Sequence, residues 1–262
     1  MTRLAPLFAA AQLENRALLI GYLPAGFPTV KGASAMIAAM VEGGVDLVEV
    51  GLPYSDPIMD GPVIQRASEI AIQNGFHIPD VFATVGNSPA PSLVMSYWNP
   101  IARFGVSKFA AELAAAGGAG LITPDLTIEE SSEWRAAAVE NSLAQIYVVA
   151  PSTTNERLTA VSSYCSVFIY AASLMGVTGA RTEISRGASD LVARLRERSQ
   201  LPICVGLGIS TREQAHEVAQ YADGVIVGSA FIKEILAAPD ETTGRDRVRK
   251  LARELAAGVK RG

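Results

Sequence analysis

Histidine and cysteine, which hold most transition metals in proteins, are scarce in this 262-residue chain, with two of each. Cys165 and Cys204 are far apart and form no CxxC or Cys/His spacing, which disfavours both a disulfide framework and a structural zinc site. His77 beside a turn and His216 in a helical stretch are expected at the surface, so the sequence predicts no metal site. Two unpaired cysteines fit a reducing compartment, and we expect a cytoplasmic protein.

Lysine is also rare, and its placement excludes one class of enzyme. A Schiff-base aldolase needs a lysine within an apolar strand. All five lysines fall instead in predicted loops or helices: Lys31, Lys108, Lys233, Lys250 and Lys260. Carboxylate, hydroxyl and backbone chemistry remains.

Strong charge and long apolar runs are missing as well. The formal net charge is −4, and Lys and Arg are scattered without a basic patch, so we expect no nucleic-acid partner. No run of eighteen or more apolar residues is present, so we expect no membrane span. The apolar N-terminal stretch is short and contains Pro6, with Leu4, Leu7 and Phe8 at helical spacing, which predicts a helix packed on the body.

Short runs rich in Val, Ile and Leu alternate with Ala-rich amphipathic stretches from Ala17 to the end of the chain. Each run is continuously apolar, as expected of parallel strands covered on both faces. We therefore predict an α/β protein with a single (β/α)8 (TIM) barrel over residues 1–262 and an extra N-terminal helix. An open doubly wound sheet is the alternative, but no GxGxxG follows the first strand. The predicted strands are residues 17–23, 47–50, 93–97, 120–123, 145–149, 167–170, 202–205 and 224–227.

Enzymes with this barrel build their sites at the carboxyl ends of the strands. The segment GLPYSDPIMDGP after the second strand and AASLMGVTGARTEISRGA after the sixth are long and irregular, which is typical of binding loops. Glu49 lies within the apolar second strand, where alternation directs it into the barrel if Val48 and Val50 face the helices. Burial there raises the pKa of a carboxyl and suits it to moving protons. A structural glutamate paired with a buried arginine is the alternative.

Two further side chains belong to the same predicted cavity. Asp60 ends the loop after the second strand, immediately before a helix opened by Pro62; a simple turn or helix cap is the alternative. Beside Glu49, it provides a second carboxylate with which acid and base roles are divided. Tyr170, at the end of the sixth strand, supplies a hydroxyl, or else fills the core.

Glycine-rich segments follow the last three strands: GVTGAR, VGLGIS and VIVGSA. Gly228 and Ser229 place backbone amides at the start of a helix, where its dipole favours anions. The last two segments match the phosphate site common in such barrels, so we predict binding of a phosphorylated substrate; simple turns are the alternative.

Together, EVGLPYSDPIMDGPVIQRA, MSYWNPI, YAASLMGVTGAR, VGLGIS and GVIVGSA resemble the tryptophan synthase alpha chain family, and the similarity runs nearly end to end. The resemblance implies a retro-aldol lyase that cleaves indole-3-glycerol phosphate to indole and glyceraldehyde 3-phosphate. It implies Glu49 as the general acid-base and Asp60 as the partner of the indole nitrogen, with Tyr170 assisting and Thr178 closing against Asp60. It also implies phosphate contacts from Gly179, Gly208, Gly228 and Ser229, and a ring pocket lined by Tyr22, Met95, Tyr97, Ile122, Val148, Leu207 and Ile226.

The family acts as an α2β2 complex, so the resemblance further implies a beta-chain partner that receives the indole and carries the pyridoxal phosphate. No cofactor is expected on this chain. Pro53 and Asp56 would face the partner. Thr127 departs from the proline that the family often has there, and the segment before the third strand is short. A free-standing lyase and a non-catalytic regulatory barrel are the competing hypotheses.

Overall fold

The eight strands form a closed parallel barrel in chain order, β1 through β8 and back to β1. The computed structural model describes residues 4–172, 181–206 and 208–262. The closed barrel confirms the predicted fold class. The strands are β1 (Leu18–Pro24), β2 (Leu47–Gly51), β3 (Ser92–Met95), β4 (Gly120–Thr123), β5 (Ala144–Val149), β6 (Ile169–Ala172), β7 (Ile203–Gly206) and β8 (Gly224–Val227).

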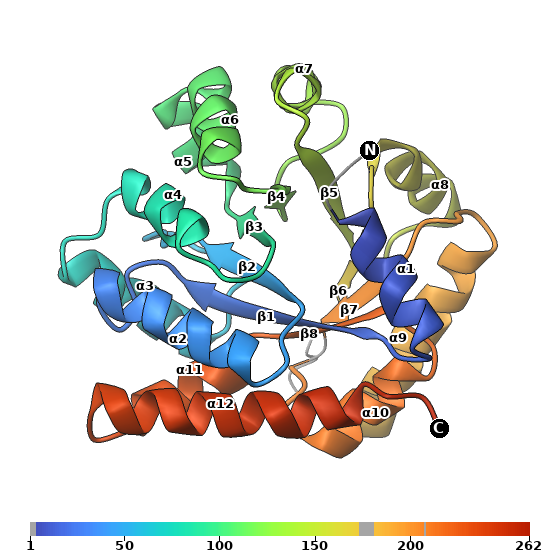
Figure 1. Ribbon diagram of the computed structural model, residues 1–262. Helices are drawn as coiled ribbons and strands as arrows, with labels where there is room; N and C mark the ends of the chain where they lie inside the picture. Colours follow the sequence, from blue (N-terminus) through green and yellow to red (C-terminus); the bar gives the residue numbers. More distant parts are fainter. Residues whose placement is uncertain (1–3, 173–180, 207) are drawn as a thin grey trace.

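Helices surround the barrel, and the long C-terminal helix α12 lies along α2, α10 and α11 (Figure 1). Pro62 is the first residue of α3, as the sequence predicted. The helices are α1 (Ala5–Leu13), α2 (Val30–Glu42), α3 (Pro62–Gln73), α4 (Ile78–Gly86), α5 (Trp98–Phe104), α6 (Val106–Ala115), α7 (Ser132–Glu140), α8 (Asn155–Tyr164), α9 (Arg181–Arg196), α10 (Arg212–Ala219), α11 (Ser229–Leu236) and α12 (Glu241–Gly258).

Several strand boundaries differ from the prediction by one or two residues, and two of these differences concern candidate site residues. The third strand ends at Met95, and Tyr97 instead precedes the first turn of α5. The sixth strand begins at Ile169, so Tyr170 stands near its start. The irregular stretch predicted after β6 extends to residue 188, whereas α9 begins at Arg181.

Apolar side chains form two cores, one between the strands and the helices and one inside the barrel. Val48 and Val50 belong to the outer core, whereas Leu47 belongs to the inner one. The N-terminal helix α1 adds Phe8 to the inner core, where Phe8 lies 5.8 Å from Phe168 between ring centroids. The predicted packing of this helix on the body is confirmed.

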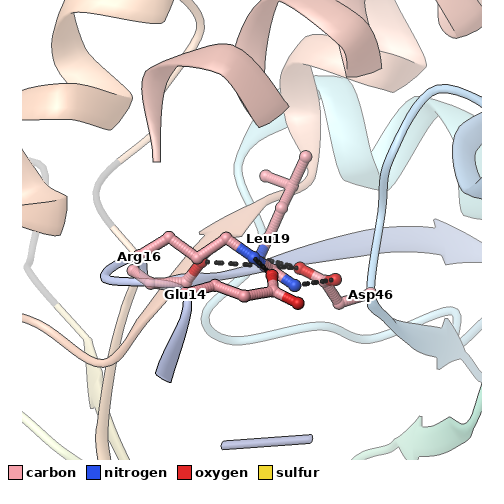
Figure 2. A network of polar contacts seen from close by, with 5 residues as sticks. Glu14, Arg16, Leu19 and Asp46 are labelled. Carbon is pink, nitrogen blue, oxygen red and sulfur yellow. Dashed lines mark hydrogen bonds and ion pairs between the residues drawn. The ribbon is translucent and has the colours of Figure 1, made fainter. Parts of the chain in front are cut away.

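A polar network joins the segments that lead into β1 and β2, at the amino end of the barrel (Figure 2). The Arg16 guanidinium donates to both carboxylate oxygens of Asp46 at 2.7 and 3.0 Å, and Leu19 N donates to Asp46 at 2.8 Å. Glu14 is a second partner of Arg16 at 2.6 Å. This end of the barrel is held by structural contacts, which leaves the carboxyl end for the site.

No helix in the described part of the chain combines the length and apolar character needed to cross a membrane.

Candidate active site

Glu49 points into the barrel, as the alternation along β2 predicts. Its neighbours in register are Tyr22 on β1 and Leu93 on β3, and its side chain is fully buried. Neither carboxyl oxygen has a hydrogen-bond partner among the residues that the structure describes. Burial raises the pKa of Glu49 to about 8. The carboxyl therefore keeps its proton at neutral pH and is poised to give it up, as a general acid must.

Two tyrosines flank this carboxyl from the strands of the barrel. The hydroxyl of Tyr22 lies over Gly51, where an added Cβ would clash with it, and that of Tyr170 lies over Gly206, where an added Cβ would be 2.7 Å away. Burial raises the pKa of both phenols well above 10, and carboxylates raise it further, with Asp60 acting most on Tyr22 and Glu49 most on Tyr170. Both phenols are therefore protonated hydrogen-bond donors at neutral pH.

Asp60 lies at the end of the loop between β2 and α3, near enough to Tyr22 and Tyr170 for its charge to raise the pKa of both phenols. Its backbone carbonyl accepts a hydrogen bond from Gln65 Nε2 at 2.8 Å. The Tyr97 hydroxyl accepts from Met59 N at 3.0 Å and donates to the Asp60 carboxylate. Burial raises the pKa of Asp60, and the hydrogen bond from Tyr97 opposes that rise. The two carboxyls thus differ in environment, since Asp60 has a donor and Glu49 has none among the described residues.

Apolar side chains from four strands line the inside of the barrel near these groups. Ile122 on β4 and Ile226 on β8 belong to the inner core, and Met95 on β3 and Val148 on β5 pack against it while only partly buried. Such a surface suits a planar apolar ring held beside the two carboxyls.

Two glycines that the sequence assigns to an anion site follow β7 and β8. Gly208 has a φ of +67°, and Gly228 precedes the first residue of α11, Ser229. Gly228 also contacts Tyr22, because a Cβ added there would lie 3.1 Å from Tyr22 Cδ1. The start of α11 therefore lies next to Tyr22, which is the register partner of Glu49. Thr178, Gly179 and Leu207 lie outside the described residues.

The two histidines lie at the surface and the five lysines lie outside the strands, as the sequence predicted. His77 precedes α4 and is bonded to Asp80 across its first turn, and His216 on α10 has Nδ1 3.0 Å from the Lys260 carbonyl; both are exposed. None of the five lysines lies in a barrel strand. Within residues 4–172, 181–206 and 208–262, no group of three or more His, Cys, Asp or Glu is placed to hold a metal ion.

Comparison with known proteins assigns this chain to one family. The family model described as "Tryptophan synthase alpha chain" matches residues 8–260. The chain belongs to the tryptophan synthase alpha chain family. The family's known role is cleavage of indole-3-glycerol phosphate, and the chain is accordingly a carbon–carbon lyase of tryptophan biosynthesis.

Individual alpha chains match over nearly their whole lengths. That of Streptomyces avermitilis is 56% identical over 258 residues, covering 97% of this chain and 93% of the relative. That of Mycobacterium tuberculosis is 50% identical over 264 residues, covering 100% and 96%. A structure of M. tuberculosis tryptophan synthase superposes with a TM-score of 0.92 at 50% identity, covering 100% and 99%. A mutant tryptophan synthase alpha-subunit from Pyrococcus furiosus gives 0.84 at 34% identity, covering 92% and 98%.

Sequence analysis missed the residues that surround the predicted ones. Tyr54 and Asn99 contact each other beside Tyr97, and neither was singled out. Gly51 and Gly206 were not recognised as the positions that make room for the tyrosine hydroxyls. The strand register could have identified them. Tyr22 pairs with Glu49 and Tyr170 pairs with Cys204, and each glycine lies two residues after that partner on the same strand.

Proposed function

We propose that this chain cleaves indole-3-glycerol phosphate by proton transfers through Glu49, assisted by Asp60. The observation that carries this assignment is a fully buried carboxyl with a pKa of about 8 and no hydrogen-bond partner in the described part of the chain. A neutral carboxyl without a hydrogen-bond partner is free to donate its proton to a substrate. It also lies toward the carboxyl end of the barrel, where such enzymes place their catalytic groups.

The protons and electrons balance through this one group. Protonated Glu49 donates to carbon three of the indole, which makes an indolenine with a positive nitrogen, and Asp60 stabilises the nitrogen-bound proton. Ionised Glu49 then removes the proton of the adjacent glycerol hydroxyl. The carbon–carbon bond breaks, its electron pair restores the aromatic ring, and the hydroxyl carbon becomes the aldehyde of glyceraldehyde 3-phosphate. Glu49 ends protonated, so the cycle closes.

The other predicted residues take supporting roles in this proposal. Tyr170 assists near Glu49, Thr178 closes against Asp60, and Gly179, Gly208, Gly228 and Ser229 bind the phosphate. The indole ring lies among Tyr22, Met95, Tyr97, Ile122, Val148, Leu207 and Ile226. The contact between Gly228 and Tyr22 supports this arrangement, because it brings the anion site next to the ring pocket. We assign no metal and no pyridoxal phosphate to this chain.

We further propose that the chain works in an α2β2 complex with a tryptophan synthase beta chain, which receives the indole and holds the pyridoxal phosphate. The loop after β2 supports this assignment, because it exposes Ile58 at 76% and Met59 at 45%. Asp56 in that loop is exposed, whereas Pro53 is buried within the chain. We place the activity in the cytoplasm, where Cys165 and Cys204 remain free thiols.

Substitution Glu49→Gln tests the assignment. The amide keeps the size of the side chain but transfers no proton, so indole release should fall by about 10²- to 10⁴-fold while substrate binding persists. The measurement is free indole formed from indole-3-glycerol phosphate, with and without the beta chain. Wild-type release by Glu49→Gln would reject the role of Glu49. If neither wild type nor Glu49→Gln cleaves the substrate but both fully stimulate the beta chain, the results would favour a regulatory barrel. If wild type cleaves the substrate equally well without the beta chain, they would favour a free-standing lyase.

A further inference from the structure

The loop between β2 and α3 is attached at both of its ends to one short segment after β3. Near its start, Tyr54 packs on Tyr97 with ring centroids 5.5 Å apart and planes inclined by 37°. The Tyr54 hydroxyl accepts a hydrogen bond from Asn99 Nδ2 at 3.0 Å. Near its end, Met59 N and the Asp60 carboxylate bond to the Tyr97 hydroxyl. Tyr97 and Asn99 therefore hold both ends of the loop.

The segment that holds the loop is itself fixed. Trp98 N donates to both oxygens of the Asp125 carboxylate, at 2.9 and 3.1 Å, which joins the segment to the loop after β4. Pro100 and Ile101 are buried in the first turn of α5. The middle of the β2 loop lacks such support, since Ile58 is largely exposed. The position of the Asp60 carboxylate thus depends on the orientation of the Tyr97 phenol.

We propose that Tyr54, held by Asn99, is a positioning residue that fixes the Tyr97 phenol so that its hydroxyl points at Asp60. The inference rests on the proposed role of Asp60 and adds to it the contacts that orient this carboxylate. Tyr54 acts through Tyr97 and contacts no reacting atom. The Tyr54 ring limits the tilt of the Tyr97 ring, and the hydrogen bond to Asn99 limits the tilt of the Tyr54 ring itself.

The effect is measurable because an oriented hydroxyl stabilises the ionised form of Asp60, which must accept the indole N–H. Among the described residues, Asp60 also interacts electrostatically with Tyr22 and Tyr170, and Glu49 acts on the same two phenols. Tyr54→Phe keeps the ring and removes the bond to Asn99. It should lower kcat/KM by about two- to tenfold and move the acid limb of its pH profile up by roughly half a unit. Tyr97→Phe should move that limb further in the same direction.

The experiment measures indole release over pH for wild type, Tyr54→Phe, Tyr97→Phe and the double variant, each as the full chain with and without saturating beta chain. Because Tyr54 acts through Tyr97, the double variant should equal Tyr97→Phe. Tyr164→Phe, which removes a partly buried hydroxyl on α8, is the matched control and should match wild type. Thermal midpoints establish that each variant is folded.

Two results would overturn the inference: wild-type kinetics in Tyr54→Phe, or single effects that multiply in the double variant. Asp60→Asn, assayed in the same experiment, separates the positioning role of Tyr54 from the proposed role of Asp60. Wild-type cleavage by Asp60→Asn would remove the role of Asp60 itself. An impaired Asp60→Asn beside an unaffected Tyr54→Phe would remove only the role of Tyr54.

Discussion

Glu49 occupies a position that most proteins fill with an apolar side chain. Leu47 precedes it on the inner face of β2, and Leu93 is its register partner on β3. Burying an ionised carboxylate among hydrocarbon costs several kcal/mol unless donors compensate. No donor in the described part of the chain bonds to it, so the side chain remains neutral instead. The same apolar surroundings that make Glu49 costly for stability make it effective as an acid near neutral pH.

The burial of Glu49 predicts a pH-dependent loss in the free energy of unfolding, which Glu49→Gln should remove. The pKa of Glu49 is about 8 in the folded chain against an ordinary 4.5, so the unfolded state releases its proton first as pH rises. Glu49 therefore lowers the free energy of unfolding progressively above pH 4.5, with the loss levelling off above pH 8. At pH 8 the loss is on the order of 4 kcal/mol relative to pH 4.

Urea unfolding of wild type and Glu49→Gln between pH 4.5 and 9 measures this difference. The two curves should diverge as pH rises, with the glutamine variant increasingly more stable than wild type. Asp56→Asn, at an exposed carboxyl on the loop after β2, is the control and should show no comparable divergence. Parallel curves for Glu49→Gln and wild type would show that the folded chain does not retain the Glu49 proton.

At the scale of the strands, the site is a set of tyrosine and glycine pairs. Tyr22 on β1 extends over Gly51 on β2, and Tyr170 on β6 extends over Gly206 on β7. In each pair the missing Cβ leaves the space that the phenol occupies. The tyrosine hydroxyls thereby lie inside the barrel, each over a glycine of the next strand.

Gly206→Ala tests whether this space matters for catalysis. The new Cβ would lie 2.7 Å from the Tyr170 hydroxyl, so the phenol must shift relative to Glu49. We expect kcat/KM to fall by about ten- to a hundredfold, because a displacement of roughly 1 Å in an active-site group is costly to catalysis. Gly187→Ala on α9, where the nearest atom is 4.0 Å away, is the control. It should keep full activity and gain stability, because alanine favours helix. Unchanged kinetics in Gly206→Ala would show that the Tyr170 position is not critical.

The elements also show what sequence alone can and cannot provide. Continuous apolar runs predicted all eight strands, and alternation along β2 predicted the direction of Glu49. The nearly unbroken apolar run before Tyr97 predicts that the strand reaches it, whereas the strand ends at Met95 and Tyr97 is the N-cap of α5. The contact between Tyr54 and Tyr97 joins residues on different loops, and no local pattern encodes such a pairing.

At the scale of the whole molecule, contacts at the amino end of the barrel join the segment before β1 to the segment after α12. Arg16 pairs with Lys260 in an isolated antiparallel bridge, and Arg261 N donates to the Asn15 carbonyl at 3.0 Å. Arg261 also donates to the carbonyls of Ala219 and Ala222, each at 2.7 Å. The barrel is thus closed at this end by contacts that link the start of β1, α10 and the residues after α12, away from the site.

Separation of the two ends predicts that stability and catalysis respond to different substitutions. Asp46 accepts three hydrogen bonds, two from the Arg16 guanidinium and one from Leu19 N. Asp46→Ala removes this acceptor, so Arg16 and Leu19 N lose these hydrogen bonds at a partly buried position. We expect a loss of about 1–3 kcal/mol in the free energy of unfolding. Glu14→Ala removes an exposed partner of the same guanidinium and should cost under about 1 kcal/mol. Both variants should cleave indole-3-glycerol phosphate at wild-type rates. A kcat reduced in folded Asp46→Ala would mean that the amino end of the barrel communicates with Glu49 along β2, whose first residue follows Asp46 directly.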